Sequence, residues 1–132
     1  MSASLPLVAD QVIDAYDFSQ HECLLDVGGG QGTFLKRVFL NTPQLKRKLF
    51  DLPGVANLAK DSFALTTDHQ DIEVFGGDFF QDPLPKGADL ITLIRVIFDH
   101  DDERVKILLS AIFAALPPGG KLLIAEPKKT GD

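Results

Sequence analysis

The stretch LLDVGGGQGTF, residues 24 to 34, places glycine at four of five consecutive positions, directly after an apolar run that carries Asp26. Glycine lacks a Cβ, so this backbone can take positive φ and let another group approach closely. So many glycines would only weaken a turn that had no close approach to accommodate. In open parallel sheets, ligands bind where a strand turns into a helix, and the helix N-terminus offers free N–H groups. The loop therefore predicts a small-molecule cradle at Gly28, Gly30 and Gly32.

The rest of the chain alternates between short apolar runs and stretches with helical periodicity. The runs predict buried parallel strands at 23–27, 47–51, 72–76, 88–96 and 121–126. The helical periodicity predicts helices at 7–17, 31–41, 54–65 and 101–116. Strands that alternate with helices are typical of α/β proteins with right-handed crossovers. We expect one Rossmann-like, doubly wound sheet of about five parallel strands with flanking helices, spanning residues 1–132.

The helix expected at 101–116 has the clearest pattern. Apolar residues recur at i, i+3, i+4 and i+7 and predict one buried face, made of Val105, Leu108, Leu109, Ile112, Phe113 and Leu116. Three acidic residues open the helix, where negative charge suits the helix dipole. The segment LPPGG at 116–120 ends it.

Composition excludes several classes of protein. The 132 residues are 45% hydrophobic, which is typical of a soluble globular domain, and no apolar run reaches the ~18 residues of a membrane span. The net charge of -6 argues against a nucleic-acid partner. The single cysteine, Cys23, excludes an internal disulfide and a thiolate metal cluster, and we expect it in the core. We expect a cytoplasmic protein with a small-molecule partner and no metal.

Two basic clusters and two of the three histidines carry no chemistry in this interpretation. The cluster LKRK at 45–48 is expected to form a solvated strand edge, and the pair KK at 128 and 129 a solvated strand edge or tail. His21 and His69 fall in expected loops among polar residues, so both are expected to be solvated.

Spacing narrows the choice of ligand. A dinucleotide fingerprint needs G-x-G-x-x-G, but the third glycine falls on Thr33 or Leu35 in the two possible registers. What remains is D-x-G-x-G-x-G, with Asp26 two residues before Gly28. Asp51 closes the second strand 19 residues after Gly32, close to the ~20 at which an acid meets ribose hydroxyls.

The third strand ends in GGDFF, which brings Asp78 and Phe79 to the same edge of the sheet. A carboxylate there would accept from an adenine amino group, and an aromatic side chain would cover the ring. Taken alone, Asp51 is equally compatible with a helix cap, and Phe79 and Phe80 with core packing. The agreement of all three strand ends favours a nucleoside-containing cofactor.

At these residues the chain resembles the class I S-adenosylmethionine-dependent methyltransferases. The segments LLDVGGGQGTF, FDLPGV, GGDFF and ALPPGGKLLIAEP resemble successive motifs of the plant-caffeate type and of bacterial small-molecule O-methyltransferases, and FDHDD resembles a segment of hydroxyneurosporene O-methyltransferase-like proteins. The resemblance implies S-adenosyl-L-methionine as cofactor. The implied cofactor-binding residues are Gly28, Gly30 and Gly32 around its methionine part, Asp51 at its ribose, Asp78 and Phe79 at its adenine, and Arg95 as a basic contact. Asp26 and Leu52 are also expected to bind the cofactor.

The resemblance also implies parts that this sequence lacks. Family members carry an N-terminal helical domain that dimerises, and they continue past IAEP into a final helix and an antiparallel strand pair. We therefore expect residues 1–132 to be a catalytic-core fragment of a homodimeric parent. The fifth strand would then be an exposed edge that favours self-association.

Methyl transfer to a hydroxyl is helped by a base that takes the hydroxyl proton. In the plant-type enzymes that base is a histidine, and the resemblance places Phe98 at its position. Asp99 matches the following aspartate, and Glu126 matches the glutamate that orients the base. His100 is the expected substitute, although transfer by proximity alone or a helix-capping role for His100 are equally open.

The sequence thus predicts an O-methyltransferase core whose full-length parent methylates a hydroxyl of a hydrophobic small molecule, carotenoid-like or polyketide/phenolic. Little methyl transfer is expected from residues 1–132 alone. Two alternatives remain: a non-catalytic cofactor-binding module and, disfavoured by the failed fingerprint, a nicotinamide-dependent oxidoreductase.

Overall fold

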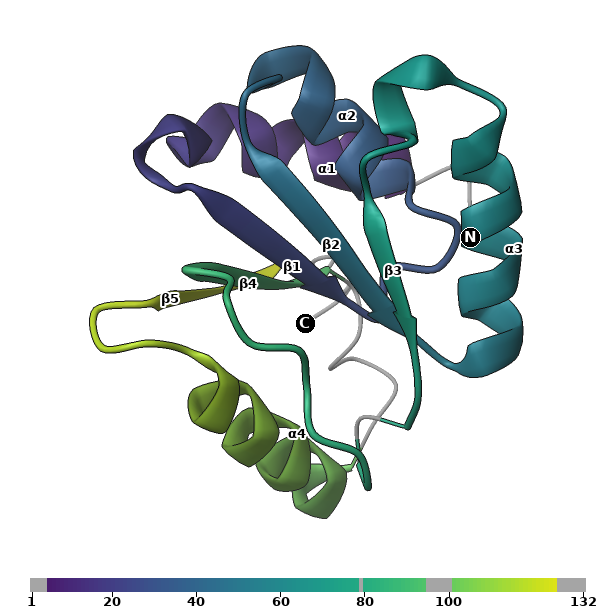
Figure 1. Ribbon diagram of the computed structural model, residues 1–132. Coiled ribbons are helices and arrows are strands. Elements are labelled where there is room, and N and C mark those ends of the chain that lie inside the picture. Colours follow the sequence, from purple (N-terminus) through teal and green to yellow (C-terminus); the bar gives the residue numbers. More distant parts are fainter. Residues whose placement is uncertain (1–4, 79, 95–100, 126–132) are drawn as a thin grey trace, which may run out of the picture.

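A five-stranded parallel sheet forms the centre of the computed structural model, which describes residues 5–78, 80–94 and 101–125 and, of the side chains, those from residue 9 onward (Figure 1). The strands are β1 (Cys23–Val27), β2 (Lys46–Asp51), β3 (Glu73–Gly76), β4 (Leu90–Ile94) and β5 (Lys121–Ala125). Their order is β3-β2-β1-β4-β5, and every neighbouring pair is parallel. From β1 the chain adds β2 and β3 toward one edge of the sheet, and it then adds β4 and β5 on the other side of β1. The expected doubly wound α/β fold is confirmed.

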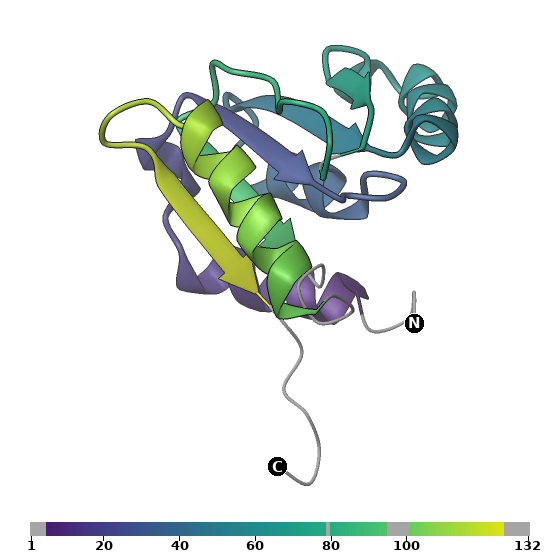
Figure 2. The ribbon, with the colours of Figure 1, turned by 90° about the horizontal axis from the view of Figure 1, so that it is seen from below.

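Helices cover both faces of this sheet (Figures 1 and 2). The described helices are α1 (Leu5–Ala15), α2 (Thr33–Asn41), α3 (Pro53–Ala64) and α4 (Asp102–Ala115), with short 3-10 turns η1 (Phe18–Gln20) and η2 (Thr67–His69). Helices α1, α2 and α3 pack on one face and α4 packs on the other. None of the described helices is long and apolar enough to cross a bilayer.

Side chains alternate along the central strands and build one core on each face. In β1, Leu24 joins the core under α1, α2 and α3, whereas Leu25 and Val27 join the core under α4. All five residues of β1 and of β4 are buried, as expected for strands covered on both sides. Cys23 belongs to the second core, as predicted. The buried strands hold their carboxyl ends, and the loops that follow them, at one edge of the sheet.

Two helix starts are encoded locally. Pro53 is the first residue of α3, where its missing N–H removes no hydrogen bond. Asp101 caps α4 by accepting from the backbone N–H of Arg104 at 2.9 Å, and Asp102 and Glu103 follow in the first turn.

The buried face predicted for α4 is only partly correct. Leu108 and Ile112 are fully buried, but Phe113 is 63% exposed. Among the described strands, β5 is the edge of the sheet beside α4. The sheet therefore covers only part of the width of the apolar face of α4. Periodicity gives the apolar stripe of a helix but not the width of the surface beneath it.

The prediction that LKRK is a solvated edge is wrong for Arg47. Its side chain is 1% exposed and donates hydrogen bonds to the carbonyl oxygens of Leu35 and Asp68, at 3.0 and 2.7 Å. Its guanidinium also lies over the ring of Phe39 and contacts His69. His69 is consequently half-buried rather than solvated, and its burial lowers its pKa, as does the charge of Arg47.

Candidate cofactor-binding site

The glycine loop after β1 adopts the backbone conformation that the sequence predicts. Gly28, Gly30 and Gly32 have φ values of 72°, 63° and 86°, which lie in the left-handed region that side chains disfavour. Gly32 also occupies the N-cap position of α2. The free N–H groups at the start of α2 therefore follow directly on the loop.

The loop is packed tightly on one side and open on the other. A Cβ added to Gly32 would collide with the ring of Phe63 on α3, and one added to Gly29 would collide with Leu49. A Cβ added to Gly30 would have no atom within 4 Å. Neighbouring side chains thus hold the loop from behind and leave space in front of Gly30.

Asp51, at the end of β2, is tied directly to this loop. Its Oδ2 accepts a hydrogen bond from the backbone N–H of Gly30 at 2.8 Å, and its Oδ1 accepts from the N–H of Leu52 at 2.7 Å. The N-cap of α3 is Leu52, which makes no side-chain cap bond. The Asp51 carboxylate therefore faces the loop instead of capping the helix. Each oxygen keeps acceptor capacity for a further donor.

Asp26 lies behind the loop rather than on its surface. It is 1% exposed, and its Oδ1 accepts a hydrogen bond from the hydroxyl of Thr92, its register partner on β4, at 2.9 Å. Its Oδ2 is buried without a hydrogen-bond partner. Burial raises the pKa of Asp26 to about 7; the Thr92 hydrogen bond opposes this shift, and the charge of Asp51 adds to it.

The third strand end contributes Asp78, which is half-buried in a tight turn. Its Oδ1 accepts from the N–H of Phe80 at 2.9 Å, and its own N–H donates to Asp82 at 2.8 Å. The N–H of Gly77 donates to the carbonyl of Asp51 at 3.0 Å, which joins this turn to the end of β2. The ends of β1, β2 and β3 thus form one hydrogen-bonded edge.

The remaining predicted site residues are Leu52 and six others. Leu52 follows Asp51 and is 49% exposed at this edge. Six residues lie outside the described part of the chain: Phe79, Arg95, Phe98, Asp99, His100 and Glu126. Their assigned roles remain predictions.

At this edge the described groups are mainly hydrogen-bond acceptors. Asp26, Asp51 and Asp78 all contribute carboxyl groups. Such a set suits a ligand that carries hydroxyl, amino or positively charged groups. The described residues hold no group of three or more His, Cys, Asp or Glu side chains arranged for a metal.

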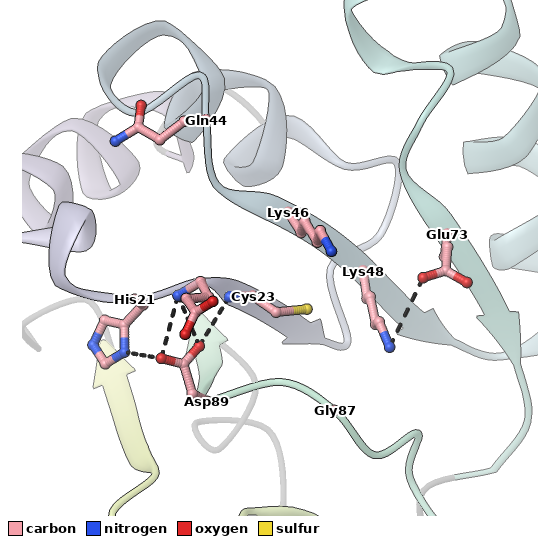
Figure 3. Close-up of a pocket in the computed structure, with 9 residues that line it drawn as sticks. His21, Cys23, Gln44, Lys46, Lys48, Glu73, Gly87 and Asp89 are labelled. Atoms are coloured by element: carbon pink, nitrogen blue, oxygen red, sulfur yellow. Dashed lines mark hydrogen bonds and ion pairs between the residues drawn. The ribbon is translucent and has the colours of Figure 1, made fainter.

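A polar cavity of about 540 Å³ lies at the opposite edge, where the strands begin (Figure 3). Asp89 accepts from the N–H groups of Glu22 and Cys23 and from Nδ1 of His21, and Nε2 of His21 contacts the hydroxyl of Tyr16 at 2.6 Å. This cluster ties the end of α1 to the start of the sheet. The prediction that His21 is solvated is therefore wrong. No local sequence pattern predicted this cluster, because Asp89 lies 68 residues from His21 in the chain.

Comparison with known proteins places the chain among methyltransferases. A family model described as an O-methyltransferase domain matches residues 1–129. The demethylspheroidene O-methyltransferase of Cereibacter sphaeroides is 44% identical over 99% of this chain and 35% of the relative. The aclacinomycin 10-hydroxylase RdmB of Streptomyces purpurascens is 38% identical over 96% of this chain and 33% of the relative.

A solved structure shows the same architecture. Human N-acetylserotonin methyltransferase, in complex with SAM, superposes with a TM-score of 0.77 at 38% identity and covers 88% of this chain and 32% of its own. The present chain spans about a third of the length of these proteins.

Proposed function

The chain belongs to the O-methyltransferase domain family, and from that membership we propose that it is the cofactor-binding core of an S-adenosylmethionine-dependent O-methyltransferase. The observation that carries the proposal is the hydrogen bond between Gly30 and Asp51, which orients a carboxylate beside the open side of the glycine loop.

The described residues account for three parts of the cofactor. Gly28, Gly30 and Gly32 give its methionine part close access to the backbone. Asp51 has two oriented oxygens for the paired ribose hydroxyls, with Leu52 exposed beside it. We assign Asp78 to the adenine amino group and Phe79 to the adenine ring. The similarity to a methyltransferase solved with SAM supports this assignment.

When bound, the cofactor supplies an electrophilic methyl group on a positively charged sulfur. The chain's own contribution is to fix that group in place and to stabilise positive charge at an edge rich in carboxyl groups. The nicotinamide alternative is disfavoured by the spacing of the glycines, because the third glycine of the dinucleotide fingerprint falls on Thr33 or Leu35, whereas an acid at the end of β2 suits the ribose of either ligand.

The acceptor hydroxyl must lose a proton as it attacks the methyl group. We assign His100 as the base, with Asp99 and Glu126 as its supporting acids, and Arg95 as a basic cofactor contact. Because Asp101 occupies the N-cap of α4, that helix has a cap without His100. This favours the catalytic role of His100 over the capping role.

The acceptor is proposed to be a hydroxyl on a hydrophobic small molecule of the carotenoid-like or polyketide/phenolic class. A relative named for demethylspheroidene methylation and another named for aclacinomycin hydroxylation support this range. The second name also shows that family membership alone does not fix the reaction.

Binding and transfer are tested separately. The purified chain is titrated with S-adenosylhomocysteine and with NAD, and then incubated with methyl-labelled S-adenosylmethionine and a panel of hydroxylated carotenoids and phenols. Binding of S-adenosylhomocysteine supports the proposal, as does the appearance of the labelled methyl group in an ether product. Preference for NAD contradicts the cofactor assignment. An acceptor that gains oxygen instead of a methyl group contradicts the reaction. Binding without any turnover, by the full-length parent as well as by residues 1–132, favours the non-catalytic alternative.

We also propose that the protein acts in the cytoplasm and self-associates. A single buried, free cysteine suits a reducing compartment. Strand β5 is an edge of the described sheet, and Ile124 on it is 44% exposed. Cell fractionation tests the first statement, and sedimentation of the purified chain over a range of concentrations tests the second.

A further inference from the structure

The buried carboxyl group of Asp26 is only half satisfied. One oxygen accepts from Thr92, and the other is buried with no hydrogen-bond partner. An ionised carboxylate in that position lacks the solvation it would have in water, and few native proteins leave such an oxygen unpaired without a functional reason.

The unpaired oxygen lies directly beneath the glycine loop. It is 2.5 Å from the point where a Cβ on Gly29 would stand, and Gly30, the next residue, donates to Asp51. The groups around Asp26 are Thr92 from β4, apolar Leu49 from β2 and the glycine backbone, and Asp51 is the charged residue that acts on it. Among the described residues, no positive charge compensates an ionised Asp26.

We propose that Asp26 is a positioning residue that carries a proton while the glycine loop is empty and releases it when a positively charged ligand binds there. The inference rests on the proposed function, because the cation is the sulfonium cofactor. Asp26 holds the loop from behind in both states, and its charge changes to match the ligand in front.

The electrostatic argument predicts a difference between two nearly identical ligands. S-adenosylmethionine carries one positive charge on sulfur that S-adenosylhomocysteine lacks. Both ligands carry the ammonium group of the amino-acid part, so the comparison isolates the sulfonium charge, and an additional positive charge nearby further favours the ionised form of a carboxyl group. Binding of the methylated cofactor should therefore release more protons than binding of its demethylated product.

The pH dependence follows from the raised pKa of Asp26, which is about 7 in the empty protein. The protein then holds about half a proton on Asp26 near neutral pH, about one at a pH one to two units lower, and little at a pH one to two units higher. Because binding favours the ionised form, affinity for S-adenosylmethionine rises with pH by at most about tenfold per unit below the pKa of the empty protein and levels off above it.

The test is isothermal titration calorimetry of the whole chain in two buffers of different ionisation enthalpy, near pH 7. The expected result is release of about half a proton with S-adenosylmethionine and clearly less with S-adenosylhomocysteine. Asp26→Asn, which keeps the shape of the side chain but cannot ionise, should release none and should bind the sulfonium ligand with little pH dependence. Asp61→Asn, on the exposed surface of α3, is the matched control, and it should leave the release unchanged.

Unchanged proton release in Asp26→Asn would overturn the proposal, as would equal release by the two ligands. If that variant does not fold, the chemical shift of the Asp26 carboxyl carbon in the wild-type chain, followed over pH with and without S-adenosylmethionine, answers the same question. A midpoint near 4 in the empty protein would then contradict it. Failure of S-adenosylmethionine to bind at all would instead contradict the proposed function.

Discussion

The backbone N–H of Gly30 donates a 2.8 Å hydrogen bond to Oδ2 of Asp51, across 21 residues of sequence. This bond fixes the open side of the glycine loop against the end of β2. It places a carboxylate with remaining acceptor capacity beside a surface that no side chain fills. A ligand that has one part lying close to the backbone of the loop and a pair of hydroxyl groups beside it matches this arrangement.

Asp51→Ala is expected to weaken binding of S-adenosylhomocysteine about ten- to a hundredfold, since charge-assisted hydrogen bonds contribute roughly 1.5 to 3 kcal/mol. Isothermal titration calorimetry measures the change. Asp61→Ala, on the exposed surface of α3, removes a carboxylate elsewhere and should leave the dissociation constant as it is. A folded Asp51→Ala variant with wild-type affinity would show that the ribose assignment is wrong.

Gly30→Val is expected to abolish detectable cofactor binding while the sheet still forms. The φ of 63° strains a β-branched residue, and the side chain would extend into the open space in front of the loop. Gly54→Val is the matched control, because a Cβ there also meets open space and the backbone is helical. Calorimetry measures binding, and circular dichroism measures the fold. Normal binding by Gly30→Val would mean that the loop is a plain turn.

Asp26 is expected to make the stability of the empty protein pH-dependent in an unusual direction. Its pKa in the folded protein, about 7, lies above the ordinary aspartate pKa of about 3.9, so its stabilising contribution is complete below about pH 4 and is lost as the pH rises through about 7. Urea unfolding should give a free energy of unfolding that falls by at most about 4 kcal/mol over this range, and Asp26→Asn should lack that component. Parallel pH profiles for the two proteins would rule this out.

Tyr16→Phe is expected to lower the free energy of unfolding by about 0.5 to 1.5 kcal/mol, through loss of the hydrogen bond with His21.

Asp89→Asn is also expected to lower the free energy of unfolding, by an amount that depends on pH. Burial alone would raise the pKa of Asp89, but hydrogen bonds from Cys23, His21 and Glu22 outweigh it and lower the pKa. The contribution of Asp89 is therefore present above about pH 4 and is lost as the pH falls through its lowered pKa. Thermal unfolding at several pH values measures both effects, and neither variant should alter cofactor affinity.

The sequence predicted the features that depend on residues close together in the chain. The first strand is found at Cys23–Val27 as expected, and the loop glycines have the predicted positive φ. That Asp51 and Asp78 share an edge with the loop followed from the rule that parallel strands end together.

Contacts between distant segments were not predictable in this way. The burial of Arg47 depends on carbonyl groups of α2 and η2, and the partner of Asp26 is Thr92, 66 residues away. Charge and polarity alone suggested a solvated Arg47, and the family resemblance counted Asp26 among the cofactor-binding residues without giving its hydrogen-bond partner. Which polar side chains are buried is decided by the pairing of whole elements, and residue type gives only a preference.

The central claim, that the cofactor binds at the glycine loop and Asp51, is tested most directly by amide NMR spectra of the ¹⁵N-labelled chain during titration with S-adenosylhomocysteine. The account predicts that the largest shifts occur at Gly28, Gly30, Gly32 and Leu52, with little change at Cys23 and Asp89 on the opposite edge. Shifts concentrated around the cavity lined by His21, Cys23 and Asp89, with the glycine loop unperturbed, would contradict it.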